Sequence, residues 1–226
     1  MTFDIFQKIL IWAIPVIFAI TVHETMHGWV ALHFGDRTAK RLGRLTLNPI
    51  KHVSVVGTII IPLLLLISHA GFVFGWAKPV PVDYRNLRNP RLHSALVAAA
   101  GPVSNIVMAV LWAVIAKMTL LLATPTSWNA AVLLAMSAVG IWMNIMLAVL
   151  NLLPIPPLDG SRVVSSLLNN EAAEKYNRLE RYGFIVLLAL LLLGWLSKIL
   201  IMPVVLMVSL IAYSFGIDFN ALMVMN

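Results

Sequence analysis

Two histidines and a glutamate stand close together near the start of the chain, in the sequence HETMH at residues 23–27. In a helix, His23 and His27 are four residues apart and lie on one face, so both imidazoles can reach one zinc ion. Glu24 lies beside them and can take a proton from a bound water, so the H-E-x-x-H pattern indicates zinc-assisted hydrolysis. The alternative is a polar cluster that only holds helices together, but a glutamate inside an apolar segment is costly and by default functional.

A catalytic zinc site needs a third protein ligand and keeps its fourth position open for water. His33 has the spacing of the longer motif H-E-x-x-H-x-x-G-x-x-H, but Val30 stands where a glycine would break the helix. Without that break, His33 points away from His27. Asp36 is interpreted more simply as the polar end of the same helix. The remaining acidic candidates are Asp83, Asp159, Glu171, Glu174, Glu180 and Asp218.

The sequence NLLPIPPLDG at residues 151–160 gives Asp159 a distinctive setting. Proline cannot continue a helix, so the backbone near the end of this apolar block loses its internal hydrogen bonds. At membrane depth this is tolerated only where the segment is buried in protein or lines a wet cavity, and a hydrolase in a bilayer needs such a cavity. Asp159 is therefore a candidate ligand, although from this stretch alone it could equally cap a helix over residues 161–168.

The elements that must position these side chains are membrane helices. The chain has 226 residues, of which 11% are charged, whereas a soluble domain carries about a quarter. Its mean hydropathy is +0.93. A spanning helix needs roughly 20 apolar residues. We expect an all-α polytopic membrane protein whose apolar blocks are residues 5–34, 54–74, 94–123, 128–153 and 183–217, the last long enough for two short spans.

The basic residues report topology rather than a nucleic-acid surface. The isoelectric point is about 10.1, but Lys and Arg fall in groups between apolar blocks and form no single stripe. By the positive-inside rule, the three main groups at residues 37–51, 78–91 and 162–181 should be cytoplasmic. The chain has no cysteine, which excludes disulfides and thiolate metal ligands.

Three motifs in order, HETMH, GPVSN at residues 101–105 and NLLPIPPLDG, resemble the site-2 proteases, a family of intramembrane zinc metalloproteases. The resemblance covers roughly residues 10 to 170, which predicts one metalloprotease domain over residues 1–226, with this core and C-terminal transmembrane segments at 183–217. Between the second and third motifs there is no room for the PDZ-type module that some relatives insert.

Carried over position by position, the resemblance implies Zn2+ as the cofactor and a defined set of site residues. Two asparagines fall on positions associated with holding substrate or stabilising the intermediate, although each could instead make an interhelical hydrogen bond. The implied zinc ligands are His23, His27 and Asp159, the general base is Glu24, and the two asparagines are Asn105 and Asn151.

The block at residues 54–74 is predicted to be re-entrant. Three apolar blocks separate His27 from Asp159, so if each block crossed the membrane, the two residues would approach opposite faces. The 54–74 block is the one with basic residues on both flanks, and its glycines and proline suit a bent element sheltered by protein.

Short β-strands are expected beside this block on the cytoplasmic side, in GRLTLNP at residues 43–49 and AKPVPVD at residues 77–83. The edge that carries Val80 and Val82 could donate hydrogen bonds to an unwound substrate that adds as a strand. A purely structural hairpin is the alternative.

These features predict hydrolysis of peptide bonds in or near the transmembrane segments of membrane-protein substrates. Such a protein would be a multi-pass component of a bacterial cell membrane, with the lipid bilayer and a substrate helix as partners, no nucleic acid, and a site open to the cytoplasm. A zinc or proton-coupled transporter is the alternative, since intramembrane His, Glu and Asp also mark ion pathways. A non-catalytic metal-binding scaffold is a third. Pseudo-symmetric halves, expected of a transporter, are not apparent in the sequence.

Overall fold

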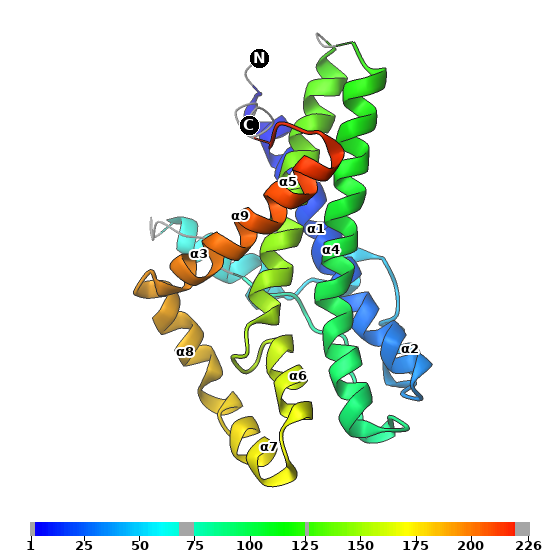
Figure 1. Cartoon of the computed structure of the whole chain (residues 1–226), viewed down its shortest axis with the longest axis vertical. Coiled ribbons are helices and arrows are strands. Elements are labelled where there is room, and N and C mark those ends of the chain that lie inside the picture. The colour runs from blue at the N-terminus through cyan, green and yellow to red at the C-terminus, as the bar shows by residue number, and fades with distance from the viewer. Residues whose placement is uncertain (1–2, 68–74, 125–126, 220–226) are drawn as a thin grey trace.

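The computed structural model describes residues 3–67, 75–124 and 127–219. Within these ranges the chain is all-helical, in agreement with the predicted fold class (Figure 1). Among the described residues, length and composition allow four helices to cross a membrane: α1 (Ile5–His33), α4 (Pro90–Leu122), α5 (Trp128–Leu152) and α9 (Trp195–Phe215).

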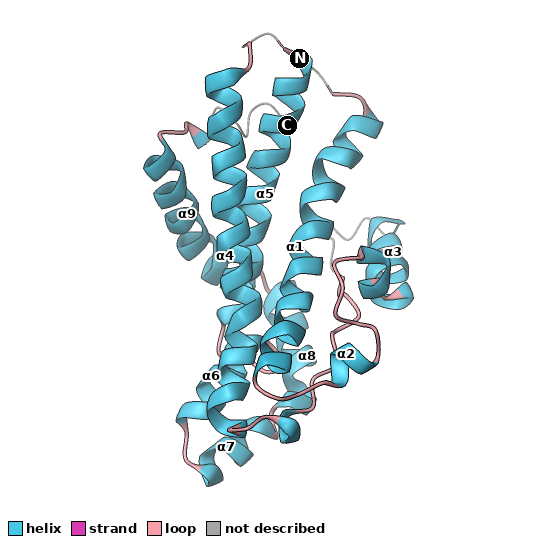
Figure 2. Cartoon of the chain, turned by 90° about the vertical axis from the view of Figure 1, so that its right-hand side faces the viewer, coloured by secondary structure: helices cyan, strands magenta, loops and turns pink. Residues whose placement is uncertain are grey.

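The shorter elements lie between these helices. They are α2 (Thr38–Arg41), the 3-10 helix η1 (Pro49–His52), the π-helix η2 (Val55–Ile60), α3 (Ile61–Ile67), the 3-10 helix η3 (Tyr84–Asn86), α6 (Asp159–Leu167), α7 (Asn170–Asn177) and α8 (Glu180–Leu192). Figure 2 shows α3 outside the bundle, on the side of α1 away from α4, while α6 and α7 lie at one end of the long helices.

The boundaries of the long helices follow from local sequence signals. Asp4 caps α1 and forms a capping box with Gln7, which satisfies free backbone N–H groups at the helix start. The Asn89 side chain caps α4 by accepting from Leu92 N–H, and Pro90 occupies the first turn, where its missing N–H costs nothing.

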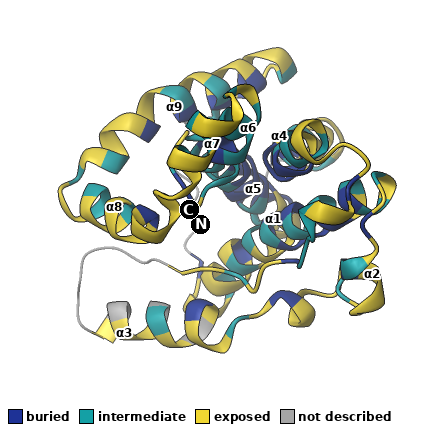
Figure 3. Cartoon of the chain, turned by 90° about the horizontal axis from the view of Figure 1, so that it is seen from below, coloured by how far each residue is buried: buried dark blue, intermediate teal, exposed yellow. Residues whose placement is uncertain are grey.

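The core forms where small residues let helices approach closely. Ala109, Ala113 and Ala116 on α4 are fully buried in a cluster that also contains side chains of α5 and α9. A Cβ on Gly140 of α5 would lie 2.4 Å from the Trp112 ring, so only glycine fits there. A second cluster joins α1 to α5. Buried residues concentrate on α5 and on the faces that meet it, whereas many large apolar side chains face outward, as expected for contact with lipid (Figure 3).

Two close approaches hold the turn after α5 in place. A Cβ on Gly183 of α8 would lie 1.9 Å from the Pro156 carbonyl oxygen, and one on Gly160 would lie 2.3 Å from that of Leu152. Neither position accepts a side chain. The proline-rich turn is thereby pressed between α5 and α8, which determines where α6 begins.

The C-terminal apolar block contains two helices rather than one continuous span. Gly194 adopts φ +70° between α8 and α9, a left-handed conformation that favours glycine and interrupts the helix. Helix α8 has 13 residues, fewer than the roughly 20 of a full span, and α9 has 21.

The two strands predicted at residues 43–49 and 77–83 are not confirmed, because no strand occurs in the ranges that the structure describes. Both segments run as turns and irregular chain. The second contains two prolines, which have no N–H to contribute to a ladder. Several of its other backbone groups bond to side chains instead: Val80 N–H donates to Glu24, and Arg44 donates to the carbonyl oxygens of Lys78 and Pro79.

Candidate active site

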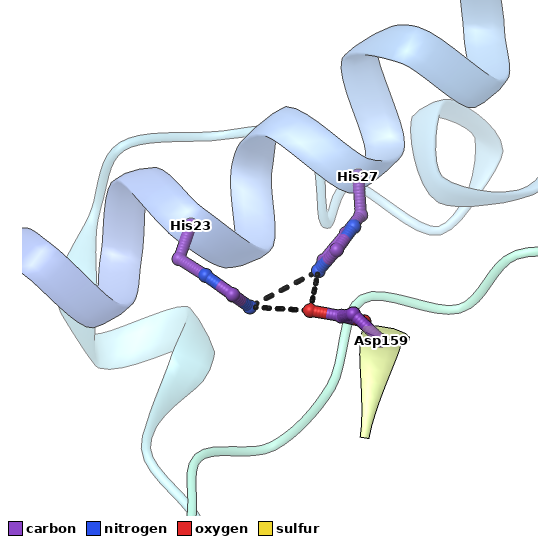
Figure 4. A group of neighbouring side chains, drawn as sticks. All are labelled: His23, His27 and Asp159. Carbon is purple, nitrogen blue, oxygen red and sulfur yellow. Dashed lines mark hydrogen bonds and ion pairs between the residues drawn. The ribbon is translucent and has the colours of Figure 1, made fainter. Parts of the chain in front are cut away.

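Helix α1 brings the two histidines of HETMH onto one face, and the start of α6 brings Asp159 to them (Figure 4). The Nε2 atoms of His23 and His27 lie 3.1 Å apart. Asp159 Oδ2 lies 3.2 Å from Nε2 of His23 and 3.4 Å from Nε2 of His27. The three potential ligand atoms all lie within 4.8 Å of one another. The structure thus brings together three residues that are separated by up to 136 positions in the chain.

The second ring nitrogen of each histidine, Nδ1, faces a hydrogen-bond acceptor. His23 Nδ1 lies 2.6 Å from Asn105 Oδ1, and His27 Nδ1 lies 2.7 Å from the carbonyl oxygen of Val97. The network therefore assigns a hydrogen to each Nδ1, which leaves each Nε2 with a free lone pair. Hydrogen bonds of this kind orient metal-binding histidines.

Three lone-pair atoms thus face one another, and this arrangement fits a cation. Asp159 Oδ2 is buried and, despite its short distances to both imidazoles, makes no well-directed hydrogen bond in the described structure. Two imidazoles and a carboxylate form a donor set that suits Zn2+ and leaves a fourth position open. Gly101 of the GPVSN motif is needed for this packing, since a Cβ there would lie 2.5 Å from Nε2 of His27.

The carboxyl group of Asp159 does not serve as a helix cap. The N-cap of α6 is Leu158, and no side chain caps it. Its carboxyl group instead faces the Nε2 atoms of His23 and His27, as a metal ligand must.

The Glu24 side chain of α1 also lies beside His23, His27 and Asp159, but its carboxylate is bonded to the backbone of another segment. Its Oε2 accepts a hydrogen bond of 2.8 Å from the backbone N–H of Val80. The expectation that Val80 is free to donate to a substrate is therefore wrong for the structure as it stands. Val80 instead holds the carboxylate of Glu24 in one orientation beside His23 and His27.

Asp36 anchors the far end of the segment that carries Val80. It is only 1% exposed, and its carboxylate accepts from the backbone N–H of Asp83 at 2.9 Å. It also accepts from Thr38 and Asn86. Burial raises the pKa of Asp36, but these donors outweigh it and lower the pKa. Interpreting Asp36 as a polar helix end missed this role.

A cavity of about 330 Å³ opens beside these residues. Asn151 lines it and donates Nδ2 to the Leu147 carbonyl oxygen at 3.0 Å. Asn105 does not line it. The full lining is His23, Glu24, His27, Pro79, Val80, Val82, Tyr84, Asn151, Pro157, Asp159 and Arg162.

Asn105 is completely buried and belongs to a chain of amides behind His23. Its Nδ2 donates to Asn144 Oδ1 at 2.9 Å and to the Ala19 carbonyl oxygen at 3.2 Å, so its Oδ1 faces His23. Asn144 in turn donates to the Gly140 carbonyl oxygen. Asn144 was not among the predicted site residues, although an asparagine two helical turns before Asn151 in an apolar block is a detectable signal.

The other described histidines make separate local contacts. His33 packs edge-on against the Phe34 ring. His93 stacks on the same ring, with 4.0 Å between the ring centroids. His52 bonds to the Thr46 carbonyl oxygen. These contacts are separate from the cluster of His23, His27 and Asp159. His69 lies outside the described residues.

Comparisons with known proteins agree with this geometry. The pattern of Peptidase family M50 matches residues 11–194. The Bacillus subtilis protein named "Putative zinc metalloprotease YwhC" is 43% identical over 184 residues, which cover 78% of each chain. A Mycolicibacterium smegmatis protein named "Putative zinc metalloprotease Rip2" is 31% identical over 80% of this chain and 66% of its own. No solved structure matches. The chain therefore belongs to peptidase family M50, the site-2 proteases, and is a zinc metallopeptidase of the membrane.

Proposed function

We propose that this enzyme hydrolyses peptide bonds in or near the transmembrane segments of other membrane proteins. His23, His27 and Asp159 hold the zinc ion, and Glu24 is the general base. One observation carries the proposal: three ligand atoms without hydrogens converge beside a glutamate, in a cavity lined partly by helices that are apolar enough to span a bilayer. A helical substrate must unwind before cleavage, because its carbonyl groups are already hydrogen-bonded.

The chemistry divides between the metal and Glu24. When bound, Zn2+ lowers the pKa of water to about 7 and polarises the scissile carbonyl. Glu24 takes the proton from the attacking water and delivers it to the leaving amine. Because Oε2 is held by Val80 N–H, Oε1 is the atom that remains for this transfer. The hydrogen bond to Val80 also keeps the carboxylate close to the histidines while the proton moves.

The two asparagines have different roles in this proposal. Asn151 faces the cavity and, with one N–H committed to Leu147, can donate the other to substrate or to the developing oxyanion. Asn105 acts through His23, whose Nδ1–H it accepts, rather than by contact with substrate. This replaces the substrate-holding role that the resemblance implied for Asn105.

Cleavage of a membrane-embedded peptide is the direct test. The zinc-loaded protein, reconstituted in liposomes with a panel of single-span peptides, is expected to yield fragments whose mass-determined ends lie within or next to the apolar segment. A zinc-sensitive fluorescent dye inside the liposomes reports zinc transport in the same samples. Zinc uptake without cleavage, in protein with full zinc occupancy, would favour the transporter instead.

We also propose that residues 54–74 enter the membrane and return on the cytoplasmic side, to which the active site opens. Two hydrogen bonds near the ends of this block support this: Lys78 N–H donates to the His52 carbonyl oxygen at 2.8 Å, and Trp76 N–H donates to that of Gly57 at 3.0 Å. Chain segments that meet in this way leave the block starting and ending at one level of the fold. Residues 68–74 lie outside the described ranges.

Single cysteines test this topology, since the chain contains none of its own. In oriented membranes, cysteine at Arg85 or Arg178 should react with an impermeant thiol reagent only from the cytoplasmic side, and cysteine at Asn129 only from the other. Ser68 and His69 should not react from the outer side. Outer labelling of positions 68, 69 and 85 together would contradict both the re-entrant element and the orientation.

A further inference from the structure

Arg162 faces the active-site cavity, although the sequence indicated only a topological role for it. It is the one Arg or Lys among the described residues that line the cavity. It lies on α6 three residues after Asp159, and side chains with this spacing are neighbours on the helix surface. A permanent positive charge therefore lies one helical turn from the proposed metal ligand.

The guanidinium of Arg162 is held by an aromatic contact and a weak ion pair, which leaves its N–H donors available. Its Cζ lies 4.6 Å from the centre of the Tyr84 ring, a cation–π contact with an aromatic residue of the same cavity. It makes no hydrogen bond to any residue that the structure describes. Its one described acidic partner, Glu180 Oε1, is 3.7 Å away, and the two side chains are 39% and 51% exposed. Such an ion pair contributes little, so an incoming anion can replace it at small cost.

We propose that Arg162, resting on Tyr84, binds a carboxylate of the peptide in the cavity. The planar guanidinium offers paired N–H donors whose spacing matches the two oxygens of a carboxylate. A peptide can supply this group in two ways: as an acidic side chain near the scissile bond, or as the new C-terminal carboxylate after cleavage. The proposal rests on the proposed function only in taking this cavity to be the peptide-binding site.

Burial of Tyr84 is consistent with this arrangement. Burial raises the pKa of its phenol, Arg162 opposes that effect, and Asp159 adds to it, which places all three groups within electrostatic reach of one another. Tyr84 thus stays neutral and presents an aromatic face beneath the cation. The contact limits the rotamers of Arg162, so less conformational freedom remains to be lost when a carboxylate binds.

Peptide binding to the Glu24→Gln protein, loaded with zinc, tests the proposal without turnover. Three fluorescent forms of one short apolar peptide serve as probes: a C-terminal amide with a central Gln, the same amide with a central Glu, and the Gln form with a free C-terminal carboxylate. We expect at least one carboxylate probe to bind about tenfold or more tightly than the neutral amide. The preference should fall to near unity when Arg162→Gln is added.

The pattern of preference identifies the source of the carboxylate. Preference for the central Glu points to a substrate side chain, and preference for the free terminus points to the cleavage product. A carboxylate that bound zinc alone would keep its advantage in the Arg162→Gln protein, and that result would overturn the proposal. Equal binding of all three probes to the protein that retains Arg162 would also overturn it.

Glu180→Gln is the matched control, because it removes the other member of the ion pair but leaves the guanidinium. If Arg162 only ties α6 to α8, Glu180→Gln and Arg162→Gln will lower binding of all probes alike, which contradicts the proposal. We expect Glu180→Gln to retain or increase the preference. If Arg162→Gln does not fold, Arg162→Lys replaces it and should weaken the preference, since a single ammonium lacks the paired donors; an unchanged preference would count against the proposal. Because no cleavage is measured, failure here is distinguishable from failure of the proposed protease activity.

Discussion

Glu24→Gln is expected to stop peptide hydrolysis while zinc remains bound. Loss of a positioned general base typically lowers kcat by about 10² to 10⁴. The amide oxygen of Gln can still accept the Val80 N–H, so the wall of the cavity should keep its place. The measurement is the initial rate of cleavage of a membrane-embedded peptide, with zinc content determined on the same sample.

Asn151→Ala is the useful comparison for this variant. If Asn151 donates to the developing oxyanion, its loss should lower kcat by about 10² to 10³ with zinc content unchanged. Aggregation of Asn151→Ala in detergent would instead favour a packing role. A Glu24→Gln protein that cleaves within tenfold of the original rate would show that another group accepts the proton.

Asp159→Ala is expected to lose zinc almost completely. Only two protein ligands, His23 and His27, would remain, and two ligands hold the ion poorly. Zinc content after exposure to a mild chelator should fall from about one ion per chain to near zero. Full occupancy in Asp159→Ala would remove this residue from the metal site, and the argument for a re-entrant 54–74 block would lose its premise.

Asp159→Asn separates a ligand from a helix cap. Asn caps helices as well as Asp does, so a capping role predicts normal zinc content in this variant. A ligand role predicts loss, because the neutral amide replaces the carboxylate that faces both imidazoles.

Asn105→Ala should behave differently again: it should bind zinc about 10- to 100-fold more weakly, yet fill at saturating zinc, because it removes only the group that orients His23.

Local patterns in the sequence were sufficient for the parts of the site that lie on one element. The spacing of His23 and His27 on a helix follows from 3.6 residues per turn, whatever packs against it. The apolar blocks at 5–34, 94–123 and 128–153 correspond to α1, α4 and α5 because a bilayer requires such lengths. The prolines after Asn151 end α5, as a residue without a backbone N–H must.

The predicted strands illustrate where local patterns were insufficient. Alternating apolar residues and prolines at 77–83 suggested an edge strand. Side chains from distant segments instead form hydrogen bonds with several of its backbone N–H and C=O groups. Glu24 binds Val80 N–H, Asp36 binds Asp83 N–H, and Arg44 binds two of the carbonyls. None of these partners could be identified from the segment's own pattern.

The sequence by itself determined that the protein is helical, lies in a membrane and carries a histidine pair with an adjacent glutamate, because each of these depends on composition or on spacing within one helix. The tertiary structure alone decided that Asp159 faces the histidines instead of capping α6, that Asn105 faces His23 and does not line the cavity, and that Arg162 does line it. The physical reason is that these contacts join α1, α4 and α6, whose approach depends on glycines that admit no side chain: Gly101 of α4 against the histidines of α1, and Gly160 of α6 against the end of α5.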